Sequence, residues 1–219
     1  LIAQYAGTVG LIRRDLLLDL GGFDPQILAE DTDLTFKIWL AGYKVKYVNY
    51  AQSGEEGVIG LRQYWHQRSR WATGHMQCAF AHMMPLLRSK RMQVKEKVDG
   101  LMLLCVYFVP ILVAFSWFFS VFLFVVKPST VLPFWVALTA SVFFLLTGHI
   151  APLLEVIIGI VCDGRKKLVA YTPLLFIMYL INVGVCCMAF LKLIFAKLTG
   201  RKVKHWNKTV HSGNCEFSF

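Results

Sequence analysis

The chain has 219 residues, of which 57% are hydrophobic and 16% are charged. Its mean hydropathy of +0.56 exceeds that of ordinary soluble domains of this size, so the composition predicts a membrane protein. The formal net charge is +10, but no stacking platform or groove-reading helix pattern accompanies it, and we expect no nucleic-acid partner.

The first 57 residues predict the end of an α/β domain. Residues 4–12 favour a strand, and a helix over 13–20 follows it, stopped by a glycine pair. A second helix over 31–41 ends at a glycine, and the Val- and Tyr-rich residues 43–50 alternate as a strand does. The expected class is therefore α/β in front, joined to a membrane α-helical part.

Residues 58–98 contain Trp, Arg and His side chains among apolar ones, with no long uncharged window. This pattern predicts one or two amphipathic helices at a membrane interface. Their histidines, His66, His75 and His82, lack the i, i+4 spacing of a metal pair. We interpret them as interfacial residues.

The region 99–195 predicts transmembrane helices. Residues 101–126 carry no charge and suffice to cross a bilayer as a helix, and residues 169–191 form a second such stretch. Residues 131–162 are long for one crossing and short for two, so the number of crossings and the side of the basic tail, 196–219, stay open.

A Gln-x-x-Arg-Trp pattern on the amphipathic segment is the first candidate for chemistry. Gln67, Arg70 and Trp71 are spaced i, i+3 and i+4, so they share one helix face. Arg70, with Arg68, suits a diphosphate leaving group, and Trp71 suits a sugar ring. The alternative is a helix whose Trp and Arg only anchor it to lipid headgroups.

An acidic cluster at the start of the helix over 31–41 is the second candidate. Inverting glycosyl transfer requires a carboxylate that takes the proton of the acceptor hydroxyl, and Asp31 is the candidate base. Glu30 and Asp33 flank it as candidate substrate-binding residues. The alternative is helix capping, because carboxylates at a helix start also satisfy its free N–H groups.

Together, the glycine turn, the acidic helix start, the Gln-x-x-Arg-Trp pattern and the apolar spans occur in an order that resembles the membrane-embedded family-2 glycosyltransferases. These include the cellulose, chitin, hyaluronan and poly-N-acetylglucosamine synthases. The resemblance implies a GT-A-like domain, of which residues 1–57 are the C-terminal part. It places the catalytic base on Asp31 and donor and acceptor contacts on Gln67, Arg70 and Trp71. Ala29 departs from the family pattern, where Thr is common.

The tripeptide Asp31-Thr32-Asp33 spells the Asp-x-Asp by which such enzymes hold a divalent metal. That motif normally closes a buried strand, which the residues before Asp31 do not resemble. We therefore expect no metal ligands in this chain, and we expect the Mg or Mn ligands of the full-length enzyme upstream of Leu1. The chain alone is then expected to be inactive.

The sequence thus predicts an inverting transferase that moves a sugar from a nucleotide-diphosphate donor to a growing polysaccharide. The expected location is the plasma membrane, with the catalytic part in the cytoplasm. One alternative is a single transfer to a lipid acceptor. Another is a non-enzymatic membrane transporter or scaffold, although the apolar spans offer little polar lining for a solute pathway.

Overall fold

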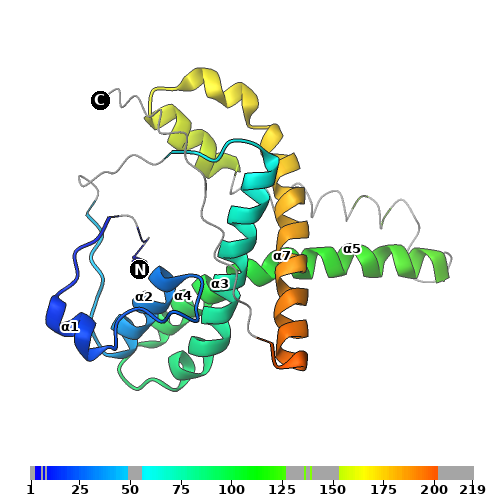
Figure 1. Ribbon diagram of the computed structural model, residues 1–219. Coiled ribbons are helices and arrows are strands. Elements are labelled where there is room, and N and C mark those ends of the chain that lie inside the picture. The colour runs from blue at the N-terminus through cyan, green and yellow to red at the C-terminus, as the bar shows by residue number, and fades with distance from the viewer. Residues whose placement is uncertain are drawn as a thin grey trace. The chain divides into compact units, whose positions relative to one another are not determined.

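The computed structural model describes residues 3–5, 7, 9–48, 56–126, 136, 139 and 153–201, and within them the regular elements are helices (Figure 1). The chain divides into two compact units. One consists of Leu1–Pro110 with Val185–Phe219, and the other of Ile111–Gly184. All the candidate site residues belong to the first unit.

The two helices predicted in the front segment are confirmed. Helix α1 spans Arg14–Asp19 and helix α2 spans Glu30–Leu40. Gly42 has a φ of 92°, and beyond it the N–H of Tyr43 donates to the carbonyl of Ile38 at 3.1 Å. This is the pattern by which a left-handed glycine ends a helix and satisfies its last carbonyls.

The strands predicted over 4–12 and 43–50 are not found among the described residues of those segments. A strand requires a neighbour that pairs its backbone N–H and C=O groups. The N–H of Tyr5 instead donates to the side-chain hydroxyl of Thr35 on α2, at 3.0 Å. The α/β class expected from the sequence is therefore not confirmed.

The core of the first unit forms around one long helix. Helix α3 spans Leu61–Arg88, and α2 and α4, Val94–Cys105, both pack against it (Figure 1). A short 3-10 helix, η1, follows α4 over Val106–Phe108. The largest side chains with no exposed surface in this core come from all three α-helices: Leu34, Phe36, Leu86 and Leu104.

Further along, the described residues include four more helical segments. They are α5, Val109–Val126, an apolar helix over Leu153–Cys162, the 3-10 helix η2, Lys166–Tyr171, and α7, Leu174–Thr199. The predicted basic tail, 196–219, lies outside the described residues from 202 onward.

Two stretches of the described chain are long and apolar enough to cross a membrane, judged by length and composition. They are Val94–Phe119 and Leu174–Thr199. They overlap the crossings expected over 101–126 and 169–191. Most of the third expected stretch, 131–162, lies outside the described residues.

Candidate active site

The loop that leads into α2 packs directly against α3 at Gly74. A Cβ atom on Gly74 would lie 2.7 Å from Cβ of Ala29 and 2.8 Å from the carbonyl carbon of Leu28, so no larger residue fits there without a shift. One turn further along α3, Gln77 Oε1 accepts a hydrogen bond from the N–H of Leu28 at 3.0 Å. Cys78 Sγ lies 3.5 Å from the carbonyl of Ala29. These contacts fix the start of α2 against α3.

Asp31 lies in the first turn of α2, and its two carboxylate oxygens have different surroundings. Oδ1 accepts the backbone N–H of Thr32 at 2.7 Å and lies 3.4 Å from the hydroxyl of the same residue. Oδ2 lies 3.2 Å from the point where a Cβ atom of Gly7 would stand. The partial positive charge of the helix start favours an ionised carboxylate at this position.

The chain segment before α1 crosses α2 next to Asp31. The side-chain amide of Gln4 donates to the Thr32 hydroxyl at 2.7 Å, and the N–H of Tyr5 donates to the Thr35 hydroxyl. That Thr35 hydroxyl in turn donates to the backbone carbonyl of Asp31 at 2.8 Å. The backbone carbonyl of Asp31 is therefore held by Thr35 and its Oδ1 by Thr32, and the segment before α1 contacts both threonines.

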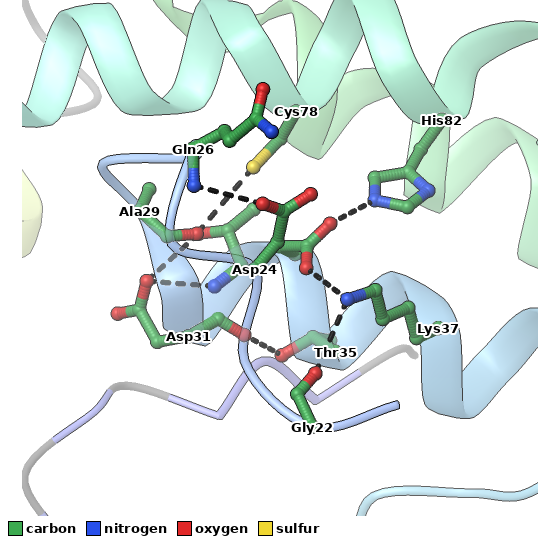
Figure 2. A network of polar contacts seen from close by, with 11 residues as sticks. Gly22, Asp24, Gln26, Ala29, Asp31, Thr35, Lys37, Cys78 and His82 are labelled. Carbon is green, nitrogen blue, oxygen red and sulfur yellow. Dashed lines mark hydrogen bonds and ion pairs between the residues drawn. The ribbon is translucent and has the colours of Figure 1, made fainter. Parts of the chain in front are cut away.

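The side chain of Asp33, two residues later, is buried inside the protein. It is 1% exposed, Oδ1 lies 2.6 Å from Nε2 of His82, and Oδ2 lies 2.8 Å from Nζ of Lys37. Burial by itself raises the pKa of Asp33, but the hydrogen bonds and charges of His82 and Lys37 bring it below the ordinary value. In Figure 2 the labelled side chains of Asp31 and His82 lie at opposite ends of this network.

This arrangement does not fit a divalent metal at Asp31-Thr32-Asp33. A metal needs carboxylate oxygens that converge, whereas both oxygens of Asp33 are already paired, with His82 and with Lys37. Within the described residues, no group of three His, Cys, Asp or Glu side chains converges on a common point. We therefore derive no catalytic step through a metal here.

The Gln-x-x-Arg-Trp pattern lies in the first half of α3. The guanidinium of Arg68 lies 5.1 Å from the ring centre of Tyr64 and 4.7 Å from that of Trp71, so it stacks on both aromatic side chains. Nε of Arg68 is buried and has no hydrogen-bond partner among the described residues. Gln67 and Arg70 are partly exposed on the same helix.

One turn beyond Trp71, His75 links this helix face to the start of α2. Its ring lies 4.6 Å from the ring of Tyr107 in η1, and its Nε2 lies 3.5 Å from the Thr32 hydroxyl. Burial lowers the pKa of His75, and the charge of Asp31 partly opposes this effect. His75 therefore lies between Thr32 at the start of α2 and Tyr107 in η1.

The structure brings His75, on the helix of the Gln-x-x-Arg-Trp pattern, within 3.5 Å of the Thr32 hydroxyl next to Asp31. Glu30 is partly exposed at the start of α2. The interfacial interpretation of the histidines was wrong for His82, which is buried against Asp33 and stacks on Phe36. Sequence reasoning also missed Thr32, which contacts the candidate base, and three residues that reach it through Thr32 or His75: Gln4, His75 and Tyr107. For His75 a usable signal existed, because positions 64, 68, 71 and 75 share one helix face.

Comparison with known proteins identifies the class. The chain matches the model of glycosyl transferase family group 2 over residues 2–194, and it belongs to that family. The chain is thus part of a transferase family whose relatives include makers of glycolipids and of polysaccharides. No solved structure matches the chain.

Three relatives illustrate the range. A beta-monoglucosyldiacylglycerol synthase from Nostoc sp. is 24% identical over 98% of this chain and 44% of its own length. The probable glycosyltransferase YdaM from Bacillus subtilis is 33% identical over 42% of the chain and 22% of its own length. A poly-beta-1,6-N-acetyl-D-glucosamine synthase from Staphylococcus aureus is 27% identical over 41% of the chain and 22% of its own length. The chain therefore spans less than half the length of these relatives.

Proposed function

We propose that this chain takes part in an inverting glycosyl transfer at a membrane, with Asp31 as the general base. The observation that carries the proposal is the state of the Asp31 carboxylate. Oδ1 is held by Thr32, while Oδ2 faces Gly7, which has no side chain to cover it. A carboxylate with one oxygen fixed and the other open suits removal of a proton from a positioned hydroxyl.

The proposed reaction moves a sugar from a nucleotide-diphosphate donor. The acceptor O–H bond breaks, its proton passes to Oδ2 of Asp31, and the oxygen forms a bond to the anomeric carbon. The bond from that carbon to the diphosphate breaks at the same time, and the diphosphate leaves with the electron pair. Gln67 and Arg70 stabilise the charge that develops on it. Trp71 offers a ring face to the acceptor, and Arg68 orients that ring by stacking on it.

Roles for the two flanking acids differ in this proposal. Glu30 is partly exposed and remains a candidate for contact with substrate hydroxyls. Asp33 is buried and paired with Lys37 and His82, so we assign it to holding α2 on α3 rather than to substrate.

A lipid acceptor is favoured over a growing polysaccharide. The glycolipid synthase from Nostoc aligns with 98% of the chain, whereas the polysaccharide synthase from Staphylococcus aureus aligns with 41%. The two apolar stretches Val94–Phe119 and Leu174–Thr199 also suit an enzyme that works at a bilayer surface. We place the reaction at the cytoplasmic face of the plasma membrane.

The acceptor class can be tested by product length. Membranes that contain the whole protein are supplied with a labelled nucleotide sugar, and the products are separated into lipid extract and polymer. One labelled sugar on an extractable lipid supports the lipid acceptor. A long water-soluble or insoluble polymer would instead support the processive reaction.

The role of Asp31 is tested by Asp31→Asn in the whole protein. Asparagine keeps the size of the side chain but cannot take the proton, so transfer should fall by at least about 100-fold while binding of the nucleotide donor persists. The matched control is Asp19→Asn, on the exposed surface of α1, which should retain full activity. Activity close to wild type in Asp31→Asn would remove Asp31 from the mechanism.

A further inference from the structure

The hydroxyl of Thr32 lies at the meeting point of three polar side chains. Gln4 Nε2 is 2.7 Å from it, Asp31 Oδ1 is 3.4 Å from it, and His75 Nε2 is 3.5 Å from it. Thr32 is fully buried, so these neighbours, rather than water, must satisfy its hydrogen bonds. A hydroxyl has one proton to donate and two lone pairs that accept.

The chemistry of the three neighbours assigns the direction of each hydrogen bond. The amide nitrogen of Gln4 only donates, and the carboxylate of Asp31 only accepts. The Thr32 proton therefore points to Asp31 Oδ1, because a bond to an ionised acceptor is the stronger one. The second lone pair of the hydroxyl then accepts the N–H of His75, which places the imidazole proton on Nε2.

This assignment also accounts for the other nitrogen of His75. Nδ1 is buried and has no hydrogen-bond partner among the described residues. With the proton on Nε2, Nδ1 carries only a lone pair, so no buried N–H is left without an acceptor. The ring packs against Tyr107, at 4.6 Å between ring centres.

We propose that His75 is a positioning residue for the base Asp31, acting through the Thr32 hydroxyl so that Oδ1 is held and Oδ2 receives the acceptor proton. The proposal rests on the proposed function of Asp31. His75 forms no bond to substrate in this scheme. Its neutral form donates to Thr32, Thr32 donates to Oδ1, and the chain of hydrogen bonds ends on the oxygen that does not react.

The charge of His75 gives the proposal a distinctive pH dependence. The charged and titratable side chains around the His75–Tyr107 pair are Asp31 from α2, Arg68 and Tyr64 from α3, and Cys186 from α7. The segment before α1 adds Gln4, which is uncharged. Burial lowers the pKa of His75 below the ordinary value of 6.5, so its imidazole is neutral at pH 7. Below the lowered pKa an imidazolium stands near Asp31, and its positive charge opposes the arrival of the acceptor proton on Oδ2.

The test compares two substitutions in the whole protein, assayed in membranes over a range of pH. His75→Phe keeps a ring against Tyr107 but loses the N–H donor, and it should lower kcat by about tenfold or more without changing the KM for the donor. His75→Gln keeps an N–H donor that does not titrate. It should retain much of the kcat. The loss of kcat at low pH that arises from protonation of His75 should be absent from its pH profile. His66→Phe, on the exposed side of the same helix, is the matched control and should behave as wild type.

Two outcomes would overturn the proposal. One is a His75→Phe protein with the kcat and the pH profile of wild type. The other is an equal loss of activity in both variants with the acid limb of the pH profile unchanged, because that result indicates packing alone. If His75→Phe fails to fold, the pH profile of His75→Gln decides. Activity close to wild type in Asp31→Asn would instead refute the proposed base, so the two failures are distinguishable.

Discussion

Nε2 of His82 lies 2.6 Å from Oδ1 of Asp33, and this buried contact joins α2 to α3 two residues after the candidate base. Lys37 binds the second oxygen of Asp33 and also donates to the carbonyl of Gly22, at 3.2 Å. Figure 2 shows how Lys37 lies between these two partners. Asp33 thus links α2 to α3 directly through His82, and Lys37 extends the link to the turn at Gly22. The rotation of α2 that presents Asp31 therefore depends on this carboxylate.

The first prediction concerns this buried carboxylate. Asp33→Asn removes the charge that faces Lys37 and His82, and it should lower the free energy of unfolding by about 3–5 kcal/mol, as breakage of a buried pair does. The unfolding temperature of the solubilised whole protein measures the effect. Asp15→Asn is the control, because the ion pair of Asp15 with Arg13 is exposed and exposed pairs contribute little to stability. Equal losses in the two variants would contradict a structural role for Asp33.

The second prediction follows from the pKa of Asp33. Because this pKa lies below the ordinary value of 3.8 in the folded protein, the folded state binds fewer protons than the unfolded state around that value. The stabilisation is therefore present above pH 3.8 and is lost as the pH falls through the lowered pKa. Unfolding temperatures across the acid range should fall more steeply for wild type than for Asp33→Asn. Parallel curves would show that Asp33 does not contribute to acid sensitivity.

The third prediction concerns the seat of α2 on α3. Gly74→Ala places a methyl group against the backbone of Leu28 and Ala29, so the two helices must separate. Overpacking of this kind costs about 1–3 kcal/mol. Gly159→Ala is the control, because a Cβ there meets nothing within 4 Å. The experiment measures unfolding temperature and transfer together, and Gly74→Ala should reduce both. A Gly74→Ala protein as stable and active as the control would contradict the close contact.

Helices and their ends were predictable from the sequence because their signals are local. Gly42, just beyond the end of α2, and the acidic first turn at Glu30 both mark boundaries that the structure confirms. The strands could not be predicted in this way, because a strand forms only where a second strand pairs with it. The sequence of residues 43–50 does not say whether such a partner is present.

The candidate site was predictable only in part for a related reason. Asp31 and the Gln67–Trp71 segment stand out because their chemistry is unusual for their positions. Thr32 and His75 do not, since a threonine in a helix and a histidine among aromatic residues have many ordinary roles. Their relevance arises from the approach of α2 to α3 at Gly74, which no spacing along the chain reveals. Asp33 shows the reverse case, because it resembles a site residue in sequence and is buried in the structure.

The last prediction concerns Gly7, whose missing side chain leaves Oδ2 of Asp31 open. Gly7→Ala would place a methyl carbon 3.2 Å from Oδ2, in the space that the acceptor hydroxyl must enter. Gly7 also has a φ of 83°, so alanine there adds about 1–2 kcal/mol of backbone strain. The variant should therefore lose both some stability and most of its transfer activity.

The effect of backbone strain can be separated from obstruction of Oδ2 by a second variant, at Gly21. Gly21 has a φ of 75°, and a Cβ there meets nothing within 4 Å. Gly21→Ala thus carries a similar strain without any group near Asp31, and it should show the same fall in unfolding temperature as Gly7→Ala but keep its kcat. If both variants lose activity equally, strain alone explains the loss and the open Oδ2 has no special part. If only Gly7→Ala loses activity, with donor binding unchanged, the acceptor hydroxyl approaches Asp31 from the side of Gly7.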